Sequence, residues 1–324
     1  GQKTIYSQVD GIWHSEKVKN ISPYLIAGSN VAVESRSNPI QENRSIVLRG
    51  SQPNDGGNFF LTNDEKENLI NFDKDFEKVI KPFIMGEDLI NGGFRWCLWL
   101  ADTNHDQYIK FCESELFNRK IEAVKNHRLA SKKEATKKLA TTPHLFDEIK
   151  QPKANYIAIP VVSSQRRNYI PIDLKNHNVI SGNKIFVMEN GGMFDFGILT
   201  SKAHNDWMRL TCGRMKSDYS YSGTIVYNTF PFPTVTDDQK KHIEHLAEEI
   251  LLTREDFAGD TLAKLYDPDT MPEPLKIAHQ NLDDAVDKLY HPKGFADTAS
   301  RLAHLLERYE TLINAEKKQA MDKK

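Results

Sequence analysis

Lys216 and Asp218 are a cation and an anion two residues apart, and they lie in the stretch WMRLTCGRMKSDYSYSGTIVYNTFPFP, residues 207–233. In an extended segment this spacing puts both side chains on one face, so that a donor stands beside an acceptor. A G·C pair offers the complementary groups in the major groove, because guanine O6 and N7 accept and cytosine N4 donates. Lys216 and Asp218 are therefore predicted to recognise one base pair together. The structural alternative is an exposed ion pair worth at most ~1 kcal/mol to stability.

The same stretch carries further cationic, hydroxyl and aromatic side chains. Charged and hydroxyl groups on a protein surface contact base edges and phosphates. We assign DNA base readout to the pair and three of its neighbours: Lys216, Asp218, Ser217, Ser220 and Arg214.

A second candidate contact region is KANYIAIPVVSSQRRNYIPI, residues 153–172, which alternates apolar and polar residues around a turn-rich centre. This pattern predicts a β-hairpin. Hydroxyl and guanidinium groups at its tip suit phosphates and base edges, and arginine binds such groups through two parallel hydrogen bonds. We expect DNA contacts from Ser163, Ser164, Arg166 and Arg167. A solubilising turn is the alternative.

Eight cations lie between residues 119 and 138, opposed only by Glu122 and Glu134. They are Arg119, Lys120, Lys125, Arg128, Lys132, Lys133, Lys137 and Lys138. The composition from about residue 111 to residue 140 is helical, so we expect a helix with a cationic face. Such a face positions the phosphate backbone, and we assign Arg128, Lys132 and Lys133 to that role. A solvated surface without function is the alternative.

Several long blocks in a fixed order make the chain similar to the C-terminal region of MmeI-like enzymes. These are type IIL restriction-modification proteins and related adenine-specific DNA methyltransferases. The blocks are residues 21–40, 50–66, 79–100, 135–172, 207–233 and 262–279. The resemblance implies a target-recognition domain that binds double-stranded DNA. It also implies a C-terminal fragment whose parent polypeptide carries an S-adenosylmethionine-dependent methyltransferase domain.

The chain itself lacks the motifs of catalysis. Adenine methylation needs an Asn/Asp-Pro-Pro-Tyr/Phe loop, and the sequence contains no Pro-Pro pair; NTFPFP, residues 228–233, has Thr-Phe where the prolines should begin. FxGxG, GxGxxG and P-loop patterns are also absent. We therefore expect no catalytic residue, no cofactor site and no metal site here. An interaction or scaffolding domain of a larger defence complex is the alternative function, and a complete enzyme of unfamiliar chemistry is the third.

Composition is that of an ordinary soluble protein, with 39% hydrophobic and 27% charged residues in a chain of 324. No apolar run approaches the ~18 residues of a membrane span, so we expect a cytoplasmic protein. The three cysteines lack metal-ligand spacing. The net charge of −2 conceals an asymmetry: residues 1–233 carry 30 Lys and Arg against 26 Asp and Glu, and residues 234–324 carry 13 against 19.

Local patterns predict the elements that position these groups. Thr62 with Glu65 and Thr236 with Gln239 have capping-box spacing, so a helix should begin at each place. Pro82 should end a short second helix over residues 76–80.

Other patterns concern turns and strands. Asn54, Asp55, Gly56 and Gly57 predict a turn with positive φ, and RWCLWL, residues 95–100, predicts a buried strand. FDFGILTS, residues 194–201, continues the β pattern, and residues 201–213 should form a short helix. Apolar residues three and four apart predict two more helices after residue 270.

The expected fold class is α+β. A mixed β-sheet target-recognition domain with flanking helices should span residues 1–233. A small all-α helical domain should follow over residues 234–324, acidic on its outside.

Overall fold

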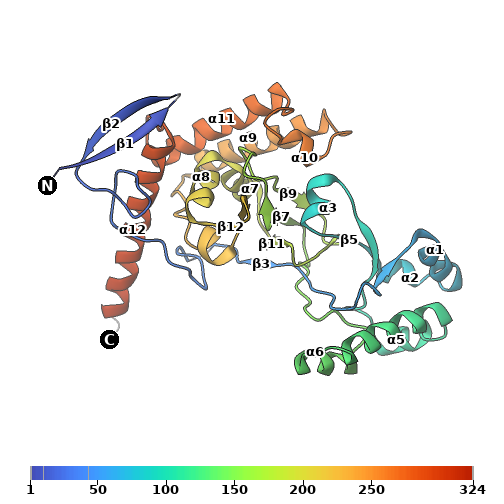
Figure 1. The fold of residues 1–324 in the computed structure, drawn as a ribbon. Helices are drawn as coiled ribbons and strands as arrows, with labels where there is room; N and C mark the ends of the chain where they lie inside the picture. Colours follow the sequence, from blue (N-terminus) through green and yellow to red (C-terminus); the bar gives the residue numbers. More distant parts are fainter. Residues whose placement is uncertain (1, 10, 43, 323–324) are drawn as a thin grey trace. The chain divides into compact units, whose positions relative to one another are not determined.

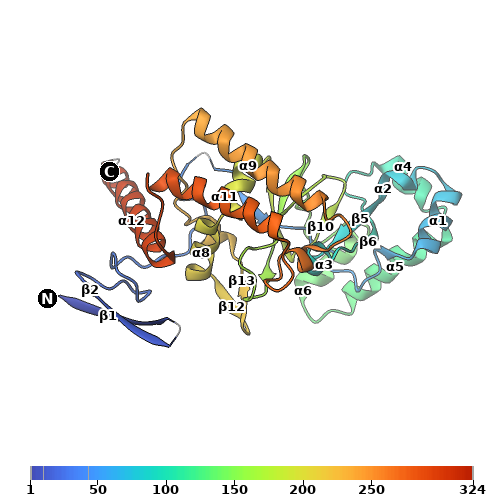
Figure 2. The ribbon, with the colours of Figure 1, turned by 90° about the horizontal axis from the view of Figure 1, so that it is seen from above.

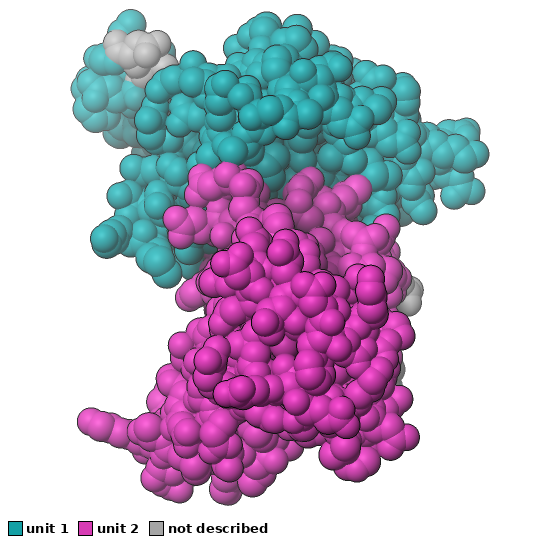
Figure 3. All heavy atoms as spheres, turned by 90° about the vertical axis from the view of Figure 1, so that its right-hand side faces the viewer, with its two compact units in different colours: residues 1–47, 162–172, 191–324 teal, residues 48–161, 173–190 magenta. Residues whose placement is uncertain are grey.

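The computed structural model describes residues 2–9, 11–42 and 44–322, and it contains two compact units (Figure 3). Unit 1 comprises residues 1–47, 162–172 and 191–324, and unit 2 comprises residues 48–161 and 173–190. Each unit is thus built from segments that are distant in the sequence.

Unit 2 is built around two four-stranded sheets. In the order β10–β5–β6–β4, β10 runs parallel to β5 and the other pairs are antiparallel, so this sheet is mixed. Its strands are β4 (Phe60–Leu61), β5 (Ile80–Ile84), β6 (Arg95–Leu98) and β10 (Ile180–Ser181). The second sheet has the order β3–β11–β7–β9. Its strands are β3 (Val47–Arg49), β7 (Tyr156–Pro160), β9 (Asp173–Lys175) and β11 (Ile185–Glu189).

Helices α1 (Asn63–Phe72), α2 (Phe76–Val79), α4 (His105–Phe111) and α5 (Glu115–Leu129) contribute to a phenylalanine-rich core that also contains residues of the first sheet. Unit 2 also contains the short helices α3 (Gly86–Asn91) and α6 (Glu134–Lys138) (Figure 1). Phe76 and Phe111 stack with their ring centroids 4.2 Å apart, and Phe59 stacks on Phe146 at 5.0 Å. Each such pair contributes ~0.5–1.5 kcal/mol beyond the burial of its two rings.

Unit 1 is mainly helical. Its helices are α7 (Met193–Thr200), α8 (Lys202–Thr211), α9 (Asp237–Glu255), α10 (Leu262–Leu265), α11 (Glu273–Tyr290) and α12 (Thr298–Asp322). Figure 2 shows α9 and α11 side by side, and α9 also packs on α7. Gly197 of α7 permits that contact, because a Cβ there would lie 2.9 Å from Ile243 Cγ2 and 3.2 Å from Ala247 Cβ.

A buried ion triad joins three of these helices. Arg301 of α12 donates from Nη1 to Asp206 of α8 at 2.7 Å, and from Nε and Nη2 to Asp287 of α11 at 2.8 and 2.7 Å. The three side chains are only 4–7% exposed. Since α8 ends at Thr211, immediately before the charged stretch, the triad fixes the helix that leads into it.

Two small sheets complete unit 1. β1 (Lys3–Val9) and β2 (Ile12–Val18) form an antiparallel hairpin. β12 (Gly213–Met215), β13 (Asp218–Ser220) and β8 (Val162–Ser163) form an antiparallel three-stranded sheet, with β13 in the centre.

The α+β fold class is confirmed, as are the elements with local signals. Capping boxes form at Thr62 and Thr236, and α2 and β6 lie where they were expected. Asn54, Gly56 and Gly57 all have positive φ, and α8, α11 and α12 occupy the predicted helical segments.

Three expectations about elements are wrong. Residues 193–200 form α7 rather than a strand. The segment 153–172 is not a hairpin by itself, because β7 pairs with β9 and β11 whereas β8 pairs with β13. The helix expected over residues 111–140 is divided: α4 already ends at Phe111, and α5 and α6 follow, with Lys132 and Lys133 in the connection between them.

Candidate nucleic-acid interface

Lys216 and Asp218 lie at the tip of the β12–β13 hairpin. Met215 pairs with Asp218, which leaves Lys216 and Ser217 as a two-residue turn. Lys216 has φ +56°, a left-handed conformation that such hairpin turns require and that costs a residue with a Cβ about 1–2 kcal/mol. The expected extended spacing is therefore wrong. The two residues are neighbours because one lies in the turn and the other begins the returning strand.

Strand alternation divides the proposed base-readout residues between two faces of the hairpin. Arg214 and Tyr219 are cross-strand partners and share one face, whereas Asp218 and Ser220 share the other. The Arg214 guanidinium lies 4.0 Å from the centroid of the Tyr219 ring, and its Nη1 donates to the Ser217 carbonyl at 3.0 Å. Arg214 thus supports the hairpin through Tyr219, a partner that the sequence pattern does not predict.

The third strand brings the 163–167 segment beside this hairpin. Ser163 of β8 pairs with Tyr219, and the Gln165 amide donates to Asp218 Oδ1 at 3.3 Å. Ser163 is 5% exposed, so its hydroxyl is not presented at the surface, and Ser164 is half-buried. Two segments some fifty residues apart therefore form one surface, with Asp218 held between turn and loop.

The two arginines of this loop have different surroundings. Arg166 is exposed and pairs with Asp269 and, at 3.9 Å, with Asp267. The hydrogen bond to Asp269 raises the pKa of Arg166. Arg167 is half-buried, and burial lowers its pKa. Arg166 must exchange a carboxylate for a phosphate if it binds DNA, and the sequence around Arg166 does not predict this internal competition.

Helices of unit 1 hold the loop at its far end. The Tyr169 hydroxyl donates to Asp283 Oδ2 of α11 at 2.7 Å, and the Ile170 amide donates to Asn205 of α8 at 2.8 Å. Burial raises the pKa of Asp283 to about 7, although the hydrogen bond from Tyr169 acts in the opposite direction. Arg209 of α8 donates to the Arg167 carbonyl at 3.0 Å.

Arg128 does not have the phosphate-binding role assigned to it from the sequence. It is 1% exposed, and its guanidinium donates to five backbone carbonyls at 2.7–3.0 Å. The acceptors are the carbonyls of Pro53, Asn54, Leu139, Thr142 and Leu145. Because arginine has only five N–H donors, none remains for DNA. Arg128 instead ties the Asn54 turn to the segment after α6.

Three other cations of the 119–138 cluster pair with carboxylates. Lys120 pairs with Glu65, Lys125 with Glu122 and Lys137 with Glu134. Lys132 and Lys133 are exposed. They belong to unit 2, whereas the hairpin tip belongs to unit 1.

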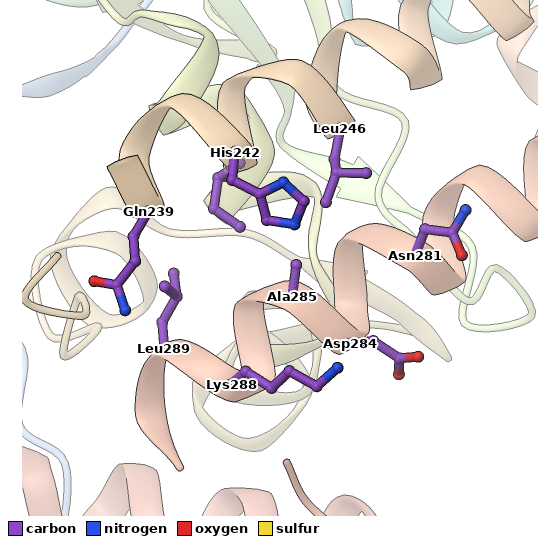
Figure 4. A pocket seen from close by; sticks show the side chains of 9 residues that line it. Gln239, His242, Leu246, Asn281, Asp284, Ala285, Lys288 and Leu289 are labelled. Atoms are coloured by element: carbon purple, nitrogen blue, oxygen red, sulfur yellow. The ribbon is translucent and has the colours of Figure 1, made fainter. Parts of the chain in front are cut away.

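A cavity of about 430 Å³ lies between α9 and α11 (Figure 4). His242, Asp284 and Lys288 supply its charged and titratable groups beside apolar Leu246 and Leu289.

Across the described ranges, no three His, Cys, Asp or Glu side chains gather closely enough to hold a metal ion. The described helices include none long and apolar enough to cross a membrane.

Comparison with known proteins identifies the chain as a DNA-recognition module of the restriction-modification class. The chain belongs to the MmeI family. A model of the MmeI target recognition domain matches residues 27–234, and a model of the MmeI C-terminal domain matches residues 235–315. The family resemblance expected from the sequence is confirmed.

Two known proteins are similar over nearly all of the chain. DNA methyltransferase A of Bacillus subtilis (strain 168) is 40% identical over 295 residues, which cover 91% of this chain and 33% of that protein. The solved structure of the type IIL restriction-modification enzyme MmeI in complex with DNA is 38% identical, with a TM-score of 0.85, and the match covers 97% of this chain and 42% of that one. This chain therefore spans between a third and a half of each relative.

Proposed function

We propose that this chain is the sequence-specific, double-stranded DNA recognition module of a longer adenine-N6 DNA methyltransferase or restriction-modification enzyme. The observation that carries the proposal is the hairpin tip, where Lys216 is kept at positive φ and Asp218 is held by the Gln165 amide. Residues in costly backbone conformations are found preferentially at functional sites. The similarity to MmeI, solved in complex with DNA, and to a DNA methyltransferase supports the same function.

The tip suits a G·C pair in the major groove. Lys216 donates to guanine O6 and N7, and Asp218 accepts from cytosine N4. Ser217, which shares the turn with Lys216, and Ser220, which shares a face of the hairpin with Asp218, contact neighbouring bases. Ser164, Arg166 and Arg167 contact the backbone beside this base pair, and Lys132 and Lys133 contact phosphates elsewhere on the duplex.

Catalysis belongs to another part of the longer polypeptide. We place the S-adenosylmethionine site in a methyltransferase domain outside this chain, and we expect the whole protein to act on DNA in the cytoplasm. Calorimetric titration of this chain with S-adenosylmethionine should give no binding isotherm, because a cofactor loop and a target-base loop are both missing from its sequence. A micromolar isotherm would contradict this assignment.

We also propose that the two parts of the chain have different roles in DNA recognition. Residues 1–233 carry the reading surface, and residues 234–324 brace it through contacts such as Tyr169 with Asp283.

Salt dependence tests DNA binding directly. For a chain that neutralises several phosphates, log K for a duplex falls steeply as log[salt] rises. Replacing Lys132 and Lys133 together by Ala should weaken binding to specific and non-specific duplexes by similar factors. It should also flatten the salt slope by at most about two units, since each neutralised phosphate contributes ~0.9.

The matched control changes Lys317 and Lys318, another adjacent exposed pair, which should leave the slope unchanged. Loss of affinity for only one sequence would contradict a phosphate role for Lys132 and Lys133. Binding that barely responds to salt would instead favour the alternative function, a protein-interaction or scaffolding domain.

A further inference from the structure

The β1–β2 hairpin and the turn after it expose an unusual amount of apolar surface. Tyr6, Ile12, Trp13 and Leu25 are 69%, 63%, 68% and 78% exposed. In β2, every residue from Ile12 to Lys17 is exposed and only Val18 is buried. An isolated two-stranded hairpin is marginally stable in water, so a hairpin with this surface gains stability by packing against another structure.

The apolar residues lie on both faces of the hairpin. Tyr6 pairs with Ser15 and Gln8 pairs with Trp13, which puts Tyr6 and Trp13 on one face. Ile12, next to Trp13 in the strand, projects from the other face. A strand with apolar residues on both faces is typical of a sheet that is covered on both sides.

Leu25 is exposed at a cost in backbone energy. Its φ is +62°, a conformation that is unfavourable for a bulky residue. Backbone hydrogen bonds from the Leu25 amide to Ser22 at 3.0 Å and from the Ser22 amide to Ile26 at 2.9 Å keep the turn in this form. Asn20 connects the turn to the hairpin, because it accepts from Lys3 Nζ at 2.9 Å and donates to the Gly28 carbonyl at 2.9 Å.

The lengths of the relatives suggest a partner for this surface. The target-recognition model begins at residue 27, so the hairpin and the Leu25 turn lie outside the part of the chain that the model matches. The relatives are two to three times as long as the matched region, and one is a DNA methyltransferase. We propose that residues 3–26 dock onto the methyltransferase part of the longer polypeptide and thereby join recognition to catalysis; this rests on the proposed function.

The size of the hairpin favours a partner in the same polypeptide over a second copy. Seven residues per strand give each face roughly 240 Å², from a rise of ~3.4 Å per residue and a width of ~10 Å. Two faces supply roughly 480 Å², below the ~800 Å² per partner of a stable complex between separate chains. Covalent linkage removes much of the entropic cost of association, so a smaller contact is sufficient within one polypeptide.

Amide hydrogen exchange tests the docking independently of catalysis. The amides of residues 3–18 should exchange at least tenfold more slowly in the full-length protein than in this chain alone. Trp13→Glu with Leu25→Asp in the full-length protein should restore fast exchange and reduce methyl transfer at least tenfold, while duplex affinity stays unchanged. Leu252→Glu, a change at another exposed apolar residue, should do neither.

The outcomes separate the two proposals. Equal exchange rates in the two proteins, or methyl transfer by the double variant at the parental rate, would overturn the docking. So would a dimer of this chain in sedimentation equilibrium that Trp13→Glu dissociates, because a second copy would then cover the hairpin. Failure of both proteins to bind any duplex, with exchange still slowed in the full-length protein, would overturn the proposed DNA recognition; the hairpin would still pack against another part of the polypeptide.

Discussion

The double change Lys216→Glu with Asp218→Arg should exchange G for C at one position of the recognition sequence and leave the other positions unchanged. It places an acceptor where the donor stood and a bidentate donor where the acceptor stood, so the favoured orientation of one base pair is inverted. Each single change should cost ~1–3 kcal/mol of binding free energy, about 5- to 150-fold, because it leaves a mismatched or repulsive group against the base pair.

The measurement begins with selection of the recognition sequence from a random duplex pool, followed by competition among duplexes that differ at one base pair. Methylation-site mapping with the full-length protein gives an independent readout. An unchanged site, or specificity relaxed at several positions, would mean that the pair only supports the fold.

Lys216→Gly is the matched control for the hairpin itself. Glycine adopts positive φ without the penalty that Lys216 carries, so the turn should be retained while the ammonium is lost. We expect this variant to lose discrimination at one base pair and to keep its stability and its binding to non-specific duplexes. Loss of folding would show that the Lys216 side chain supports the hairpin.

Replacement of Arg301 by Ala should lower the free energy of unfolding by ~3–5 kcal/mol, because Asp287 would remain buried without a counter-charge and Asp206 would keep only Arg209. Burial by itself lowers the pKa of Arg301, but its hydrogen bonds and ion pairs with Asp287 and Asp206 outweigh burial and raise it. Since Asp206 lies in α8, which leads into β12, affinity for the specific duplex should also fall.

Urea denaturation of the Arg301 variant measures the loss of stability. Lys317→Ala, at an exposed cation of the same helix, should change the free energy of unfolding by no more than ~0.5 kcal/mol. If Arg301→Ala were equally mild, the triad would not hold the three helices together. Replacing Arg301 and Asp287 together by apolar residues of similar volume should recover most of the stability, because Asp206 keeps Arg209 as its counter-charge and no buried charge is left alone.

The sequence by itself determined the features that depend on neighbours in the chain. Thr62 and Thr236 cap helices through residues three positions away, and the Asn54–Gly57 turn needs the φ values that glycine adopts readily. The helices after residue 270 follow from apolar residues three and four apart. Family membership also followed from long blocks of sequence, and the matching family models confirm it.

Only the tertiary structure decided the features that depend on distant partners. Residues 193–200 are buried on nearly every side, so they show no polar face by which a helix differs from a strand, and packing on α9 through Gly197 accompanies the helical form. The sequence next to Arg128 does not distinguish it from an exposed cation. Its five carbonyl acceptors come from residues 11 to 75 positions away in the chain. The 163–167 loop meets Asp218 because β8 pairs with β13, and such long-range pairing leaves no signal in either segment alone.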